Sequence, residues 1–275
     1  ITAGPAKWGF FNTHYLNTDR GGSVNYAKVI RSNLVLDADF GTRQQTEQFY
    51  PLTEGDWERI NRSNVGFTVG QFHPELNPRN VIPKVNFNVP NSPNFTFDNR
   101  LVDQGEAWLT SLRTNLTWIK GNHSIKGGYY FELSQNSEGN GGVGAGPWAG
   151  EFTFNTDTNN PYDTNYSYAN ALLGTFREYR EIDAFSEVVG RRYISEFYLQ
   201  DTWTLDQLTI NAGLRAEKWE HFDSNGDKSA SFDWDIAPRV SVVYDLFGDG
   251  RTKLFGFGGR YYDPIRNNMA DFAGA

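Results

Sequence analysis

Residue types that could catalyse a reaction or bind a metal are present, but their spacing does not suit either task. Asp223 and Asp227 have the acidic spacing that opens a calcium loop, in which a hard cation takes oxygen ligands from alternate residues. Lys228 stands where that loop needs glycine, and Trp234 stands where it needs glutamate. A solvated turn is therefore the favoured interpretation of residues 223–227, and a calcium site is the weaker one.

Motifs for catalysis are also lacking elsewhere in the sequence. The four histidines show neither HxxxH nor HExxH spacing, no G-x-S-x-G elbow occurs, and there is no cysteine to act as a nucleophile. The Gly-rich stretch 139–150 lacks the Lys-Ser/Thr ending of a phosphate-binding loop, and its composition indicates a flexible loop instead. We expect no enzymatic activity, no bound metal and no cofactor.

Two tryptophans are the candidate ligand contacts. Trp57 and Trp148 fall in stretches that we expect to be outer loops, where an indole can stack on a sugar ring or anchor a partner protein. The alternative, which we favour, is that both side chains only pack the loops on themselves.

The clearest secondary-structure pattern lies between Arg191 and Glu220. Two runs alternate apolar and polar side chains, and only Asp206 and Gln207 separate them, which predicts an antiparallel hairpin with a tight turn. Both runs exceed the roughly five or six residues usual in soluble domains and reach the roughly 9–11 that a tilted membrane-spanning strand needs. The polar face suits the wet lumen of a wide barrel better than a dry core.

The two faces of such strands lead to predictions for individual residues. The polar face is expected to hydrate a lumen through Arg113, Glu132, Glu196, Arg215 and Glu217. The apolar stripe is expected to touch acyl chains and includes Leu208, Ile210, Leu214, Phe255 and Phe257. Asp201 interrupts this stripe, and we place it near the membrane rim. Girdles at the membrane interfaces are expected from Trp108, Trp118, Tyr129, Trp203 and Trp219.

About eight strands are expected along the chain. The strands are one within Trp8–Tyr15, one over 24–37, two at 107–119 and 124–134, the two of the central hairpin, and the last hairpin joining 236–244 to 253–262. Between them we expect a turn cluster at 17–22, a Pro-rich loop over 38–105, a second long loop over 135–190 and a polar loop over 221–233. Tight turns thus alternate with long loops, an asymmetry typical of outer-membrane barrels, whose long loops lie outside.

Composition limits the class of protein further. The 275 residues carry a net charge of -8, which argues against nucleic acid as a partner because phosphate binding needs a basic stripe. No run of 18 apolar residues occurs, which excludes helical membrane spans. Nothing suggests a linker, so residues 1–275 are expected to be part of a single barrel domain. The start at ITAGPAKWGF shows neither a Met nor a signal segment, and we interpret the chain as a piece of a longer protein.

Several segments resemble a known family. Residues 198–203 (YLQDTW), followed by 208–217 (LTINAGLRAE), are similar to a strand pair in the barrel of TonB-dependent outer-membrane receptors. Further segments resemble the large Oar-like receptors of that family, namely 69–78, 115–128, 169–174, 237–239, 244–245, 248–253 and 259–264. The likeness covers most of the chain from about Gly66 onward, and the opening part matches no family that we can name. No TonB box, plug domain or terminal aromatic strand is visible.

The resemblance implies energised import, with a TonB-type energy complex as partner and a barrel of about 22 strands, of which this chain would supply part of the wall. We therefore expect an all-β protein, an antiparallel transmembrane β-barrel segment with long extracellular loops, in contact with lipid in the outer membrane of a Gram-negative-type bacterium. The ligand cannot be read from the sequence. The alternatives are a non-transporting surface barrel whose loops mediate adhesion or assembly, and a soluble β-rich glycan-binding protein or enzyme.

Overall fold

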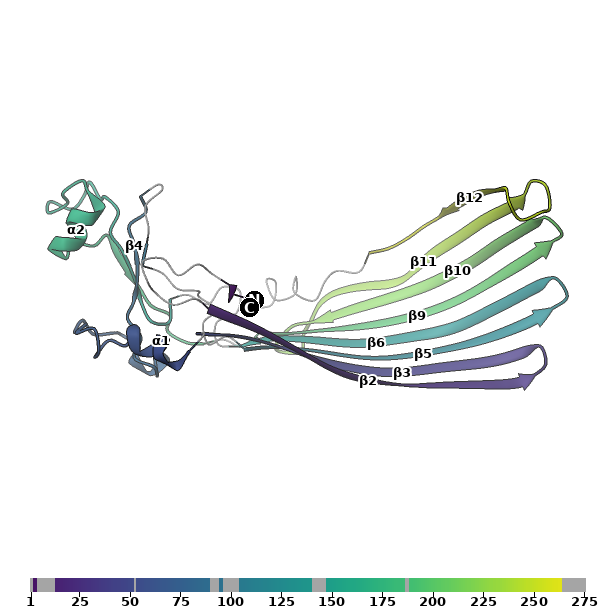
Figure 1. Cartoon of the computed structure of the whole chain (residues 1–275), viewed down its shortest axis with the longest axis horizontal. Coiled ribbons are helices and arrows are strands. Elements are labelled where there is room, and N and C mark those ends of the chain that lie inside the picture. Colours follow the sequence, from purple (N-terminus) through teal and green to yellow (C-terminus); the bar gives the residue numbers. More distant parts are fainter. Residues whose placement is uncertain are drawn as a thin grey trace. The chain divides into compact units, whose positions relative to one another are not determined.

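The long strands form one antiparallel sheet. The computed structural model describes residues 2–3, 13–51, 53–89, 94–95, 104–139, 147–185 and 188–263. In these residues nine strands pair in the order β1-β2-β3-β5-β6-β9-β10-β11-β12 (Figure 1). Their bounds are β1 Thr2–Ala3, β2 Thr13–Arg31, β3 Leu34–Pro51, β5 Gln104–Lys120, β6 His123–Gly139, β9 Val188–Leu205, β10 Leu208–Phe222, β11 Lys228–Asp245 and β12 Lys253–Gly259. The predicted all-β antiparallel fold class is confirmed.

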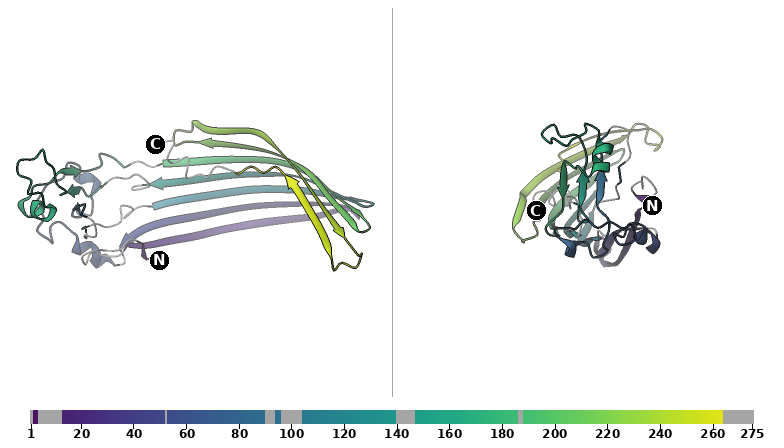
Figure 2. Two further views of the ribbon diagram at one scale, coloured as in Figure 1. Left: turned by 90° about the horizontal axis from the view of Figure 1, so that it is seen from above. Right: turned by 90° about the vertical axis from the view of Figure 1, so that its left-hand side faces the viewer.

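Most of these strands are long. Seven of the strands in the described ranges contain 15–19 residues each, well beyond the roughly 3–10 usual in globular proteins. Figure 2 shows the strands side by side and curving along their length. The sheet is open, because within the described residues β12 does not pair with β1 or β2.

Tight turns join neighbouring strands at one end of the sheet. The central hairpin turns at Asp206 and Gln207 as predicted, and Asp206 adopts the left-handed conformation, with φ 45°. The turn expected at 17–22 is wrong: these residues lie inside β2, and the chain turns at Ser32 and Asn33. Gly21 permits close approach of β3, because a Cβ there would lie 2.9 Å from the Thr42 carbonyl oxygen.

The connections at the other ends of the strands also differ in part from the prediction. The first long loop begins only after Pro51, since β3 continues far beyond residue 38. Residues 223–227 alone join β10 to β11, because the expected polar loop at 221–233 is mostly strand. Most of the strand expected at Trp8–Tyr15, and part of the Gly-rich stretch, lie outside the described residues.

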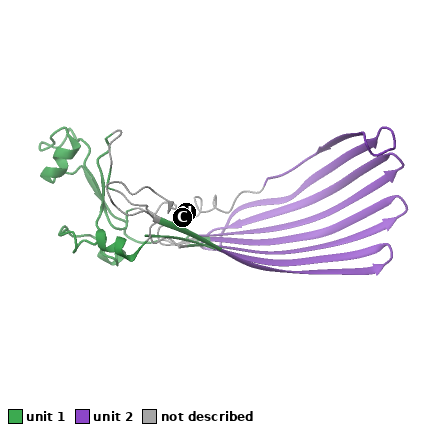
Figure 3. Cartoon of the chain, viewed as in Figure 1, with its two compact units in different colours: residues 1–18, 46–106, 137–188 green, residues 19–45, 107–136, 189–275 purple. Residues whose placement is uncertain are grey.

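The two long loops carry their own small elements. They contain helices α1 (Glu54–Arg59) and α2 (Ser167–Leu173), a 3-10 turn (Pro74–Leu76), and a three-stranded sheet of β4 (Lys84–Asn86), β7 (Glu151–Thr153) and β8 (Glu178–Arg180). One apolar cluster contains Trp57, Ile60, Val81 and Trp148, and a second contains Phe87, Phe152 and Phe154. These residues fall in one of two compact units, residues 1–18, 46–106 and 137–188; the rest of the chain forms the other (Figure 3).

The register of the large sheet shows which side chains share a face. Ile210 lies opposite Trp203 on β9 and Val242 on β11, which gives an apolar face. On the other face Glu217 lies opposite Glu196. The apolar face is open, with Leu199 60% exposed, whereas Glu217 is only 4% exposed. This is the reverse of a soluble protein, in which carboxylates lie outside and leucines inside.

The last strand departs from the predicted stripe. Phe257 lies opposite Ser241, whose hydroxyl accepts a hydrogen bond from Asn211 on the polar face. Phe255 shares that face, so the prediction that both side chains touch lipid together with Leu208 and Leu214 is wrong. The connection over residues 246–252 sets the register of β12, and alternation within β12 alone could not show which of its faces joins which face of β11.

Candidate functional site

Charged side chains are paired across three strands of the polar face. The guanidinium of Arg192 on β9 lies 2.7 Å from Glu132 on β6, and the Tyr130 hydroxyl donates to the same carboxylate at 2.6 Å. Arg215 on β10 contacts Glu196 on β9, and its Nε lies 2.9 Å from Glu217. Four of the five residues predicted to line a lumen are thus brought into one cluster with Arg192.

The fifth predicted residue, Arg113, lies on the same sheet in a separate pair. Its guanidinium donates to Asp39 on β3 at 2.9 and 3.0 Å, and Asn25 on β2 donates to the same carboxylate at 2.7 Å. Arg113 and Asp39 line a hollow of about 710 Å³ together with Lys126 and Glu196. A hydrogen-bonding surface therefore extends from β2 to β10.

A glycine lets one tyrosine bridge two strands of this surface. The Tyr198 hydroxyl on β9 donates to the Asn115 side chain on β5, passing over β6. A Cβ on Gly128 of β6 would lie 2.6 Å from the Tyr198 ring and 2.8 Å from the Asn115 oxygen. No local sequence pattern predicts this contact, because it joins residues 83 positions apart.

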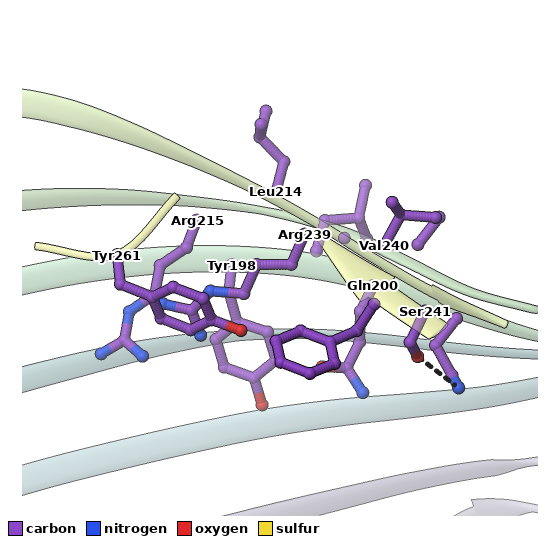
Figure 4. Close-up of a pocket in the computed structure, with 13 residues that line it drawn as sticks. Tyr198, Gln200, Leu214, Arg215, Arg239, Val240, Ser241 and Tyr261 are labelled. Carbon is purple, nitrogen blue, oxygen red and sulfur yellow. Dashed lines mark hydrogen bonds between the residues drawn. The ribbon is translucent and has the colours of Figure 1, made fainter. Parts of the chain in front are cut away.

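A second hollow lies over β9, β10 and β11 (Figure 4). It encloses about 450 Å³ and is lined on the polar face by Tyr198, Gln200, Arg215, Arg239 and Tyr261, among others. The Arg239 guanidinium lies 4.4 Å from the centre of the Tyr261 ring. Gly213, opposite Gln200 and Arg239, leaves the floor of the hollow free of a side chain. The polar side chains that line the two hollows can hydrogen-bond water or a polar solute.

The predicted girdle residues divide between the faces. The apolar face carries three exposed tryptophans, Trp108, Trp118 and Trp203. On the same face the Tyr129 ring packs against Phe197. The assignment of Trp219 to a girdle is corrected. Its register opposite Ile194 places it on the face of Glu217 and it is 4% exposed, packed edge-on against Phe232. Strand alternation from Glu217 already required this orientation.

The two loop tryptophans lie together in a packed cluster. Trp148 is 2% exposed and Trp57 is also buried, beside Ile60 and Val81. Arg79 stacks over the Trp57 ring at 4.8 Å. In this conformation neither indole is open to a ligand from solution, so their burial agrees with the packing interpretation.

Polar contacts fix the same loops. Glu181 accepts hydrogen bonds from the backbone N–H groups of Phe72 and His73, at 3.1 and 2.8 Å. It also accepts one from the Tyr179 hydroxyl, and burial together with this bond raises the pKa of Tyr179. The backbone N–H of Asp157 lowers the pKa of Asp163 by bonding its carboxylate. Hydrogen bonds therefore hold the described parts of these loops in a defined conformation.

Comparison with known proteins identifies the class. The chain belongs to the outer membrane beta barrel domain family, whose sequence profile matches residues 2–235. This places it in the outer membrane, as predicted. No helix in the described ranges is long and apolar enough to cross a membrane.

Individual relatives are more distant. A stretch of 77 residues, 28% of this chain, is 34% identical to the TonB-dependent transporter Oar of Myxococcus xanthus and spans 7% of that protein. Among solved structures, the chain is similar to the ferric citrate transporter FecA, with 10% identity, a TM-score of 0.45, and coverage of 89% of this chain and 27% of FecA. It is also similar to the translocator domain of the autotransporter NalP from Neisseria meningitidis, with 10% identity, a TM-score of 0.37, and coverage of 92% and 62%.

Proposed function

We propose that this chain forms part of the wall of a transporter barrel that takes up an unidentified ligand across the outer membrane, with energy supplied by a TonB-type complex. The observation that carries the proposal is the distribution of side chains over the sheet, with paired charges on one face and exposed apolar side chains on the other. The matched segment of a TonB-dependent transporter supports the energised class. Neither of the alternatives, a non-transporting surface barrel or a soluble β-rich protein, has comparable support.

The polar face would serve as the wet side of that wall. Glu132, Glu196, Glu217, Arg113 and Arg215 would hydrate the path, and each of the two arginines contacts at least one carboxylate. A wall with balanced charges offers hydrogen bonds to a passing solute without a strong field that would retain it. The proposal includes no catalytic step, and no nucleic acid takes part.

The function can be tested without knowing the ligand. Spent medium from wild-type cells, cells lacking the full-length gene, and wild-type cells treated with a protonophore would be compared by mass spectrometry. We expect at least one compound to be depleted only by untreated wild-type cells, because uptake needs both the barrel and the energised inner membrane.

Two results would contradict the proposal. Identical depletion by wild-type and deletion cells would exclude uptake under the conditions used. A loss of surface attachment in the deletion strain, without any change in depletion, would support the barrel as a mount for its loops.

A further inference from the structure

A hollow on the apolar face lies beside two of the tight turns. It is lined by nine residues, of which Trp118, Lys120, His123, Asp201 and Trp203 carry the polar and aromatic groups, and it encloses about 890 Å³. Lys120 ends β5 and His123 begins β6, on either side of the Gly121–Asn122 turn. Asp201 and Trp203 precede the Asp206–Gln207 turn. We call this hollow with its five named side chains the rim site.

All five side chains of the rim site belong to the apolar face. Trp203 lies opposite Ile210 and Asp201 lies opposite Ala212, so both share the stripe of Leu208 and Leu214. Trp118 and Lys120 are two residues apart on β5 and follow Leu116 on the same side of the strand. Polar groups on a face that otherwise contacts lipid are costly in the acyl region and favourable at its edge.

The histidine is held in a defined orientation. His123 Nδ1 lies 2.6 Å from Asp201 Oδ2, and the imidazole stacks on the Trp203 ring with centroids 5.3 Å apart and planes inclined by 10°. His123 lies on β6, whereas Asp201 and Trp203 lie on β9, and His123 and Asp201 are 78 residues apart in sequence. Because Nδ1 faces the carboxylate, Nε2 is the ring nitrogen left for a ligand.

The lysine supplies a positive charge beside an aromatic ring. Lys120 Nζ lies 5.2 Å from the centre of the Trp118 ring. In the described part of the chain no carboxylate pairs with Lys120, and its side chain is exposed. A cation beside an exposed tryptophan, in a hollow that a second tryptophan also lines, is suited to an anion at the depth of the lipid headgroups.

We propose that the rim site binds the headgroup phosphate of a phospholipid in the leaflet at the tight-turn end of the barrel. Lys120 would donate to the phosphate oxygens, and His123, carrying a proton on both ring nitrogens, would donate from Nε2 while Asp201 accepts from Nδ1 and positions the ring. Ile125 and Leu205, which also line the hollow, would contact the start of an acyl chain. These apolar neighbours favour a lipid over free phosphate. The inference rests on the outer-membrane placement and not on the transport proposal.

Lipid retention by the purified full-length protein tests the rim site. Delipidated protein in detergent would be titrated with phosphatidylethanolamine, and the bound fraction would be measured by native mass spectrometry. We expect the Lys120→Gln/His123→Gln variant to bind about tenfold less lipid, as expected for loss of a charge-assisted hydrogen bond. Arg251→Gln is the matched control, because it removes a cation from the connection over residues 246–252 at the same end of the sheet. It should bind lipid as the wild type does.

Two further measurements separate loss of the lipid contact from misfolding and from binding of a free phosphate ion. Lys120→Gln alone changes one exposed side chain, so it should fold as the wild type does, by circular dichroism, and still bind severalfold less lipid. Inorganic phosphate at the same concentration as the lipid should not displace it. Equal lipid binding by wild type, the single variant and the double variant would overturn the proposal, and displacement by inorganic phosphate would show a phosphate site instead of a lipid site.

Discussion

At the scale of single residues, Gly128 decides whether Tyr198 can reach Asn115. A Cβ at position 128 would lie 2.5 Å from the backbone oxygen of Thr114, closer than real Cβ contacts. The neighbouring Gly127, on the apolar face, has no such restriction, since its Cβ would lie 3.5 Å from Leu199 Cδ1. Two adjacent glycines in one strand therefore have different roles.

Gly128→Ala should destabilise the protein by about 1–3 kcal/mol, because the added methyl group forces the Tyr198 ring or β5 to move. Gly127→Ala is the matched control and should be neutral, or stabilising by up to about 1 kcal/mol, through the lower backbone entropy of the unfolded chain. Urea unfolding in lipid vesicles, followed by tryptophan fluorescence, would measure both. Equal stability of the two variants would show that the close approach has no energetic consequence.

The paired charges lead to a second prediction at this scale. Arg215→Gln leaves the buried carboxylates of Glu196 and Glu217 facing each other and should cost up to about 3 kcal/mol. Arg113→Gln removes the same charge from a more exposed pair with Asp39 and should cost about 0–1 kcal/mol. The same unfolding measurement distinguishes them. A cost for Arg113→Gln as large as that for Arg215→Gln would contradict the role given to burial.

At the scale of elements, β9 has an apolar face, which we expect to contact lipid, and a polar face, which we expect to contact water. Leu199→Arg places a charge on the apolar face and should cost about 2–4 kcal/mol if the residue lies near the middle of the bilayer. Gln200→Arg places the same charge on the polar face and should change stability by less than about 0.5 kcal/mol. Folding yield in lipid vesicles, read from the shift in electrophoretic mobility on heating, would show the difference. Similar yields for both would argue against a bilayer on the apolar face.

The loop clusters are the second element-scale feature that can be tested. Trp148→Ala should cost the loop unit about 3–5 kcal/mol, because it removes a large buried side chain beside Ile60 and Val81. Limited proteolysis should then cleave residues 147–185 at least about a hundredfold faster. Tyr162→Ala, which alters an exposed ring in the same unit, should leave the cleavage rate unchanged. Unchanged cleavage of Trp148→Ala would show that the cluster does not hold the loops.

At the scale of the whole molecule, the exposed apolar face requires a lipid environment. Exposed apolar side chains such as Phe197, Leu199 and Leu214 lie on one face of the sheet, whereas monomeric soluble proteins rarely expose large contiguous apolar patches. We expect the native protein to stay in the membrane fraction after an alkaline carbonate wash and to enter solution only with detergent. A monodisperse protein in plain buffer would instead favour the soluble alternative.

Much of the fold could be predicted because strand alternation is a local property. The hairpin around Asp206 and Gln207, the strand pair around Gly121, and the alternation of tight turns with longer connections follow from period-two patterns and turn residues. The turn of the first hairpin is predicted at the wrong position, because Gly21 and Gly22 indicate a turn by composition, whereas in the structure Gly21 lets β3 pack closely. Composition alone does not distinguish these two uses of glycine.

Period-two alternation along the sequence is enough to predict long membrane-crossing strands with one wet and one apolar face, and it selects four of the residues in the charged cluster. The register between strands appears only in the folded protein, and it places Phe257 on the polar face, brings Tyr198 to Asn115 and pairs His123 with Asp201. The physical reason is that alternation fixes side chains relative to their own strand, whereas pairing between strands depends on contacts that are far apart in the chain.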